Sequence, residues 1–162
     1  MMGVRVLAFS CVLALAACSE PAPPNTMAVD DDVLTTTNST RDIGDHTVHV
    51  NAISTDQLTA EVASAYGIAR SKNRAMLNVS VLRKSSNGGV TPARARVTAS
   101  ATNLSGQLRN LTIRETVEGD AIYYIGETVI TNAETLVFTI EVTPEDSAQT
   151  HTIRYMKQFF ID

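Results

Sequence analysis

Alternation of apolar and polar side chains at every second position restricts the fold of this chain more than any other feature. The segment 94–102 follows this alternation without interruption, and the segment 135–142 follows it except at Val137. Successive side chains of a β-strand point to opposite faces, so a period of two predicts a strand with one buried face. The positions expected to face the core are Ala95, Val97, Ala99 and Ala101 in the first segment and Leu136, Phe138, Ile140 and Val142 in the second.

Further segments have strand character, and turn residues separate them from one another. Short strands rich in β-branched residues and set at regular spacing favour two antiparallel sheets packed face to face. We therefore predict an all-β fold, an immunoglobulin-like antiparallel β-sandwich of about seven strands. The additional strands are expected at residues 46–52 and 77–83, around Leu111 and Ile113, and at 121–131 and 150–160.

Residues 121–131 depart from simple alternation because apolar side chains occupy both parities. Ile122 and Tyr124 fall on one face of an extended segment, whereas Tyr123 and Ile125 fall on the other. A strand buried on both faces has this pattern, and so does a strand with a bulge. We predict either a central strand or a bulge near Gly126.

One short helix is expected between the first two strands. Thr59 can accept hydrogen bonds from backbone N–H groups two or three positions on, as helix-capping threonines do. Residues 60–66 are good helix formers, and Gly67 suits the left-handed position just past a helix end. About two turns are not stable alone, so this helix must pack on another element. The apolar residues that recur at helical spacing are Leu58, Val62 and Tyr66.

The first 17 residues have the organisation of a bacterial export signal. Arg5 gives a positive start, and the apolar run 6–15 is shorter than the ~20 residues that a membrane span needs. The run ends in Leu-Ala-Ala-Cys, which resembles the lipoprotein signal and makes Cys18 the lipidated residue. Lipidation with diacylglycerol and palmitate would anchor the chain stably. In such lipoproteins aspartate after the cysteine favours the inner membrane, so Ser19 predicts the outer membrane.

The predicted organisation is a lipoprotein signal peptide at residues 1–17, a lipidated disordered tether at 18–45 and a folded domain at 46–162. The tether is rich in proline, aspartate and threonine, and so polar a segment cannot offset the entropy of ordering. Cys11 leaves with the signal peptide and Cys18 carries lipid. The mature chain therefore has no thiol for a disulfide or a nucleophile.

Six short stretches of the sequence carry a resemblance to a known family. They are Asn51-Ala52-Ile53, Tyr66-Gly67-Ile68, Ser71-Lys72-Asn73-Arg74, Asn78-Val79-Ser80-Val81, Ala121-Ile122-Tyr123-Tyr124-Ile125 and Phe159-Phe160. Together they resemble the DUF4426 family of uncharacterised gammaproteobacterial lipoproteins. The likeness spans residues 46–162, nearly all of the foldable chain. Because that family has no established activity, the resemblance implies no catalytic residues.

A basic loop after the predicted helix is the first candidate for a binding site. Arg70, Lys72 and Arg74 place three cations within five residues. Cations near a helix C-terminus stabilise the helix dipole, so one interpretation is that these side chains fix the loop. The alternative is contact with an anion, such as a partner carboxylate or a lipopolysaccharide phosphate.

A metal site is a second interpretation of the same sequence. Imidazole and thioether groups suit Cu(I), so His151, Met156 and Met76 would be the ligands of a periplasmic copper carrier. These residues lack the dense spacing of a metal-binding motif. His46 and His49 lie three apart in a predicted strand, which places them on opposite faces. We expect no cofactor, and copper stays an alternative.

Motifs of zinc proteases, α/β-hydrolases and nucleotide-binding enzymes are absent from the sequence. A hydrolase assembled from residues far apart in the sequence remains an open alternative. The formal net charge of −4 argues against nucleic acid as a partner. We therefore expect a non-catalytic binding or accessory module, anchored to the outer membrane on its periplasmic face. Its expected partner is a periplasmic protein or an envelope polymer.

Overall fold

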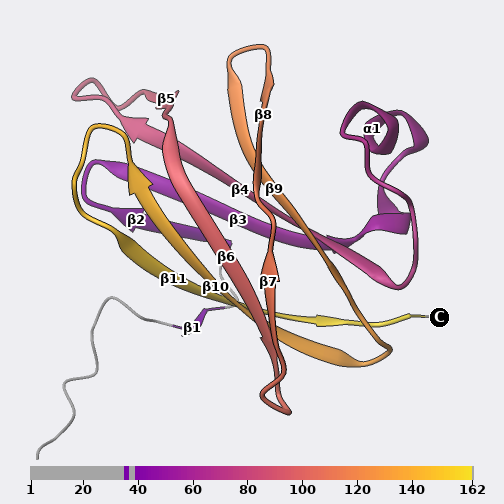
Figure 1. The fold of residues 1–162 in the computed structure, drawn as a ribbon. Helices are drawn as coiled ribbons and strands as arrows, with labels where there is room; N and C mark the ends of the chain where they lie inside the picture. Colours follow the sequence, from indigo (N-terminus) through magenta and orange to yellow (C-terminus); the bar gives the residue numbers. More distant parts are fainter. Residues whose placement is uncertain (1–34, 37–38, 162) are drawn as a thin grey trace, which may run out of the picture.

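Two β-sheets lie face to face and enclose the core (Figure 1). The computed structural model describes residues 35–36 and 39–161, so the predicted signal peptide, Cys18 and most of the predicted tether lie outside the described residues. Strands within the sheets pair antiparallel, except that β1 runs parallel to β11. The predicted immunoglobulin-like antiparallel β-sandwich is confirmed.

The order of the strands differs between the two sheets. The first sheet has the order β1-β11-β10-β6-β7, and the second has β2-β3-β4-β9-β8 with β5 beside β4. The first sheet consists of β1 (Thr35–Thr36), β6 (Ala95–Asn103), β7 (Leu108–Leu111), β10 (Glu134–Pro144) and β11 (His151–Phe159). The second consists of β2 (Thr40–Ile43), β3 (His46–Ser54), β4 (Arg74–Lys84), β5 (Val90–Pro92), β8 (Arg114–Glu118) and β9 (Ala121–Val129).

The described part of the chain has eleven strands, so the predicted number of about seven is too low. β1 and β5 are very short, with two and three residues. β2 lies within the segment predicted as a tether, yet it pairs with β3 and its Ile43 is buried. The folded part of the chain therefore begins before residue 46.

The predicted strand around Leu111 and Ile113 is in fact two strands in different sheets. β7 ends at Leu111 in the first sheet, and β8 begins at Arg114 in the second. The alternation continues across this point because both Leu111 and Ile113 pack against the core. Local pattern alone therefore does not reveal that the chain crosses from one sheet to the other here.

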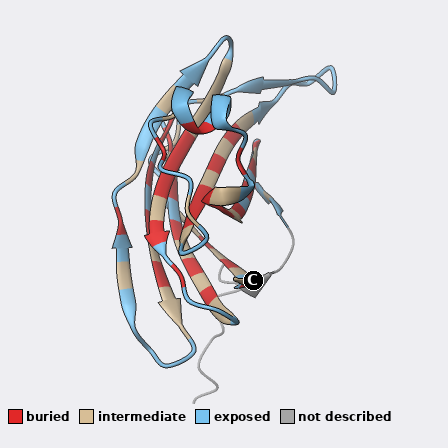
Figure 2. Cartoon of the chain, turned by 90° about the vertical axis from the view of Figure 1, so that its right-hand side faces the viewer, coloured by how far each residue is buried: buried red, intermediate tan, exposed pale blue. Residues whose placement is uncertain are grey.

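The core lies between the sheets and is formed by the inward positions of the alternating segments (Figure 2). All inward positions predicted in residues 94–102 and 135–142 are at most 9% exposed. Phe138 lies within this layer, with its ring centroid 6.4 Å from those of Tyr155 and Phe159. Each side chain buried in this way adds roughly 1.5–3 kcal/mol to the stability of the fold. The period-two prediction is thus confirmed at the level of individual positions.

β9 is an inner strand of the second sheet, flanked by β4 and β8. Its register with both neighbours runs without an inserted residue, so the alternative of a bulge near Gly126 is wrong. Tyr124 faces the core between the sheets, whereas Ile125 faces an outer cluster beneath α1. Gly126 lets the crossing segment pack closely on β9: a Cβ there would lie 2.6 Å from Ile113 Cδ1 and 3.2 Å from Leu111 Cβ, so these side chains would have to shift.

The predicted helix is present as α1 (Ala60–Ala65), which follows the 3₁₀ turn η1 (Thr55–Gln57). Thr59 caps it, since its Oγ1 accepts a hydrogen bond from the Val62 N–H at 3.2 Å. Gly67 follows the helix with a φ of +61°, as predicted for a residue just past a helix end.

The packing face of α1 matches the predicted one at Leu58 and Tyr66 but not at Val62. Ala63 is buried, whereas Val62 is 38% exposed. Leu58, Ala63 and Ile68 pack on Met76 of β4 and Ile125 of β9, on the outer face of the second sheet. In the described part of the chain, the helices are too short and too polar to cross a bilayer.

Candidate functional site

The predicted basic loop connects α1 to β4, and hydrogen bonds hold two of its cations. The Arg70 guanidinium donates to the backbone carbonyl of Asp56 at 2.8 Å. The Arg74 guanidinium donates to the Glu127 carboxylate of β9 at 3.2 Å. Lys72 is exposed on the same loop. Arg70 and Arg74 therefore fix the loop to its surroundings, and anion binding by the loop stays a prediction.

A buried threonine, Thr55, links the turn before α1 to the loop after it. Thr55 has no exposed surface. Its Oγ1 lies 2.9 Å and 3.1 Å from the carbonyl oxygens of Ala69 and Ser71, to which it donates, and it accepts from the Ser71 N–H at 2.9 Å. Sequence reasoning missed this residue because it stands in a polar run without a motif.

The three residues predicted as copper ligands lie on different surfaces. Met76 is buried beneath α1 on the outer face of the second sheet. Met156 belongs to the first sheet and has the parity opposite to the buried Ile153 and Tyr155, so it points to the outer face of that sheet. His151 begins the same strand with the inward parity. The structure therefore does not bring this ligand set together.

Two histidines do share a location, at the end of the sandwich where β3 begins. His46 and His151 line one shallow pocket of about 490 Å³ together with Asp146. His46 is buried, its Nε2 lies 3.3 Å from Asp146 Oδ1, and Arg83 pairs with the same carboxylate. In the part of the chain that the structure describes, no group of three histidine, aspartate or glutamate side chains is arranged to hold a metal ion.

Burial is the main influence on the pKa of the His46 imidazole. Loss of hydration lowers the pKa of its imidazole below 6.5, and the positive charges of Arg83, His151 and Lys84 act in the same direction. Asp45 favours the protonated ring. The Arg83 guanidinium pairs with the Asp146 carboxylate beside the ring. His46 is therefore held neutral as part of the structure.

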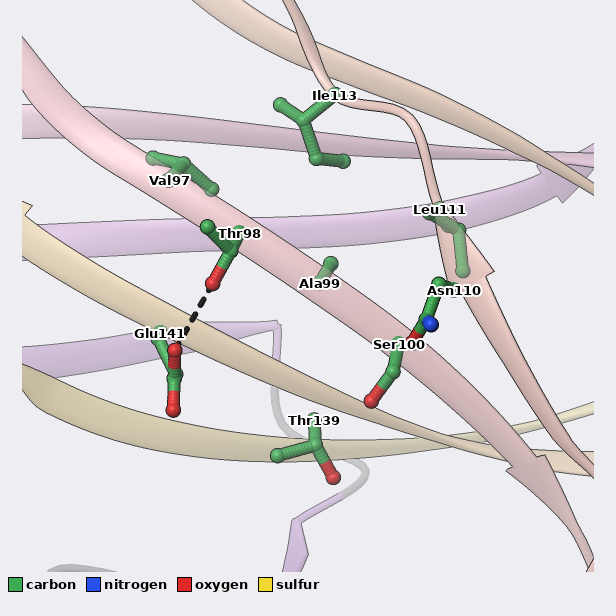
Figure 3. Close-up of a pocket in the computed structure, with 9 residues that line it drawn as sticks. All are labelled: Val97, Thr98, Ala99, Ser100, Asn110, Leu111, Ile113, Thr139 and Glu141. Carbon is green, nitrogen blue, oxygen red and sulfur yellow. Dashed lines mark hydrogen bonds between the residues drawn. The ribbon is translucent and has the colours of Figure 1, made fainter.

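An open groove of about 430 Å³ lies along β6, beside the place where β7 ends (Figure 3). Its polar side chains sit on the outer face of the first sheet, where Thr98 and Ser100 of β6 stand directly opposite Glu141 and Thr139 of β10. Thr98 Oγ1 donates to the Glu141 carboxylate at 2.9 Å. Sequence reasoning did not identify this groove. The apolar residues that line it are Val97, Ala99, Leu111 and Ile113.

The groove combines the groups that bind polar, extended ligands. It offers hydroxyls, the Asn110 amide and one carboxylate beside an apolar strip. The groove brings polar and apolar side chains to one hollow, at the place where the chain crosses from the first sheet to the second. It is therefore the candidate binding site that the fold itself creates.

Comparison with known proteins connects this fold to a family. The sequence model of the DUF4426 family, described as a domain of unknown function, matches residues 40–162. The crystal structure of a DUF4426 family protein from Pseudomonas aeruginosa has 36% sequence identity and a TM-score of 0.65, over 76% of this chain and 94% of that chain. No curated protein matches the chain.

Two structures of FetP from uropathogenic Escherichia coli share the fold. The first, a variant solved with copper bound, has 11% identity and a TM-score of 0.53 over 77% of this chain and 96% of that chain. The second, expressed in the periplasm, has 11% identity and a TM-score of 0.53 over 76% and 94%. At this identity the likeness concerns the fold alone.

The family match begins at the first residue of β2 and runs to the last residue of the sequence. It thus includes both sheets except the short β1, together with α1 and the groove beside β6. The chain belongs to the DUF4426 family.

Proposed function

We propose that this protein is a non-catalytic binding module, anchored by lipid to the outer membrane on its periplasmic face. The Leu-Ala-Ala-Cys sequence ending at Cys18 carries this proposal, because it has the spacing at which lipoproteins are cleaved and acylated. Two or more acyl chains hold a protein stably at a bilayer. Its partner is a periplasmic protein or an envelope polymer.

The arrangement of the domain supports a binding role. β1, the described element nearest to Cys18 in the sequence, stands at one edge of the first sheet, and β6 and β7 stand at the other. A tether leading from β1 to the membrane leaves the edge with the groove open to a partner. The polar groups of the groove suit recognition by hydrogen bonds.

Anchoring is tested by Cys18→Ser in cells. We expect the variant to leave the membrane fraction and collect with soluble periplasmic proteins, while the unmodified chain stays with the outer membrane. Mass spectrometry of the mature N-terminus should find an acylated Cys18. A Cys18→Ser protein that still sediments with membranes would contradict the anchoring proposal.

A periplasmic copper carrier is the second candidate. The observation in its favour is that His46 and His151 line the same pocket at the end of the sandwich. Neutral imidazoles are suitable copper ligands. Titration with Cu(I) under reducing conditions decides between the candidates, with His46→Ala and His151→Ala compared with Met76→Leu and Met156→Leu. Binding weaker than micromolar in the unmodified chain eliminates the copper carrier.

A further inference from the structure

β6 has a complete neighbour on one side and an incomplete neighbour on the other. It pairs with β10 from Ala95 to Asn103. With β7 it pairs only from Ala99 to Thr102. The register of the described strands therefore leaves residues 95–98 of β6 without a strand beside them on the β7 side. The groove lies beside Val97 and Thr98 of this open segment and continues along Ala99 and Ser100.

Three hydrogen bonds determine which backbone groups of β6 point to the open side. The N–H and C=O of one residue in an antiparallel strand point the same way, and the direction alternates along the strand. Glu145 N donates to Arg94 O, so residue 94 points toward β10. Asn103 N donates to Gln107 O, and Ala95 N donates to Tyr124 Oη, so the odd positions point away from β10.

Val97 is the odd position between Ala95, whose N–H has a partner, and Ala99, which pairs with β7. Ala99 lies opposite Leu111 of β7, and Ala95 is bonded to Tyr124 Oη. If β7 continued in register, Ile113 would stand opposite Val97. Instead the chain crosses to the second sheet between Leu111 and Arg114. The N–H and C=O of Val97 therefore face the groove where the next residue pair of a strand would lie.

Backbone groups in this position are a template for an added strand. A row of unpaired N–H and C=O groups at a sheet edge accepts extended peptides, whose main chain provides the complementary bonds. Here the template is short and sits beside a hollow that can receive side chains. A polypeptide satisfies both the backbone groups and the alternating faces, which a sugar polymer does not.

The negative charge of Glu141 indicates which side chain the partner would place beside the groove. Thr98 stands between the open edge and Glu141, whose carboxylate accepts its hydrogen bond. A side chain on the added strand would reach this carboxylate across Thr98, about two strand spacings or roughly 10 Å from the added backbone. Lysine and arginine have the length and the charge for this contact.

We propose that a partner protein adds a short extended segment along β6 at Val97 and places a lysine or arginine on Glu141. This inference rests on the proposed binding function and names its site and partner class. The chain's own tether is a poor occupant because it contains the acidic run Asp30-Asp31-Asp32. A second copy paired at the same edge would bring two Glu141 carboxylates to one site.

The test uses the full mature chain in detergent and two synthetic peptides, read by NMR titration. One peptide is acetyl-Thr-Val-Lys-Val-Thr-amide, and the other has glutamate in place of lysine. We expect the lysine peptide to bind two- to fivefold more tightly, roughly the effect of an exposed ion pair. With that peptide at ten times its Kd, amide exchange at Val97 should slow by about tenfold.

Charge reversal identifies the recognised group. Glu141→Lys should invert the preference so that the glutamate peptide binds more tightly. Glu61→Lys, an equal charge change on exposed α1, should leave the preference unchanged. Folding of both variants is checked by their unperturbed amide spectra outside the changed positions.

Four outcomes would overturn the proposal. One is Val97 exchange that does not respond to saturating peptide, and another is a peptide preference that survives Glu141→Lys. Slow exchange at Val97 before any peptide is added would mean that the tether or a second copy already covers the edge. A shift at Val97 with peptidoglycan fragments but with neither peptide would assign the groove to a polymer. None of these results bears on membrane release of Cys18→Ser, so the anchoring proposal is judged separately.

Discussion

The molecule has two apolar layers, and they are held in different ways. The core between the sheets takes every second side chain of long strands, so strand pairing alone places its members. The layer beneath α1 is assembled from Leu58, the helix, the following loop and single side chains or pairs from β3, β4 and β9. Thr55 and Arg70 fix the connection that supplies it. We call the core between the sheets the periodic layer, because its members follow from the alternation within each strand. We call the cluster beneath α1 the composite layer, because its members depend on how the segment from Thr55 to Ser71 is fixed to the sheet.

The largest expected effect tests the periodic layer. Phe138→Ala leaves a cavity among Tyr155 and Phe159, so we expect it to lower the free energy of unfolding by about 3–5 kcal/mol. Phe160→Ala is the matched control, since Phe160 is 64% exposed and should change stability by less than about 0.5 kcal/mol. Urea denaturation measures both. Equal losses in the two variants would remove the distinction between core and surface at this end of the sheet.

The composite layer is tested by Thr55→Val, which keeps the shape of the side chain and removes the hydroxyl. The carbonyls of Ala69 and Ser71 and the Ser71 N–H then lose their buried partner, at a cost of about 1–3 kcal/mol. We expect faster hydrogen exchange in residues 58–71 while exchange in β6 and β10 stays slow. Thr91→Val, on exposed β5, serves as the control. Uniform acceleration across both layers would show that they unfold as one unit.

Replacing Arg70, Lys72 and Arg74 together by alanine should produce a smaller loss, about 1 kcal/mol, because these contacts are largely at the surface. The loss should shrink at high salt, since the Arg74–Glu127 ion pair is screened. Thermal denaturation with Arg96→Ala as the control measures it. A triple variant that melts like the unmodified chain but no longer captures a partner would make the loop a binding site instead.

The smallest expected effect concerns His46, the buried first residue of β3 at the end of the sandwich. Its pKa is lowered in the folded chain, chiefly by burial, so the folded state binds fewer protons than the unfolded state as pH falls below about 6.5. The stabilising contribution of the neutral ring is therefore present above about pH 6.5 and is lost as the pH falls toward the lowered folded pKa.

His46→Gln should flatten this part of the stability profile, whereas His49→Gln, at an exposed position of β3, should not. Unfolding free energies measured between about pH 5 and 8 test the difference. A profile that flattens equally in both variants would place the acid sensitivity elsewhere in the domain.

Much of the periodic layer could be predicted from the sequence, down to single inward positions such as Phe138 and Val97. Thr59 and Gly67 likewise act locally, and the structure places them at the two ends of α1 as predicted. Val62 was predicted to pack but is exposed, because the side of α1 that meets the sheet depends on the loops around it. The early start of the domain at β2 was missed for the same reason: its pairing with β3 is not visible in four mostly polar residues.

The candidate groove could not have been predicted, and its origin explains why. It exists because β7 stops at Leu111 and the chain crosses to the second sheet while the alternation of side chains continues. The nearest sequence signal is Gly126, where a side chain would collide with Ile113. In the sequence that glycine is equally compatible with a bulge.

Taken alone, the sequence determined the class of fold, the inward positions of the alternating strands, and the helix with its ends, while the export signal on which the anchoring proposal rests stays a prediction. Each of these depends on residues a few positions apart, because strand parity, helix capping and signal cleavage are local properties. The tertiary structure alone decided which strand lacks a full neighbour, which two histidines line one pocket and which side chain packs against Gly126. Those outcomes depend on contacts between distant segments, and no local pattern specifies which segments will pair.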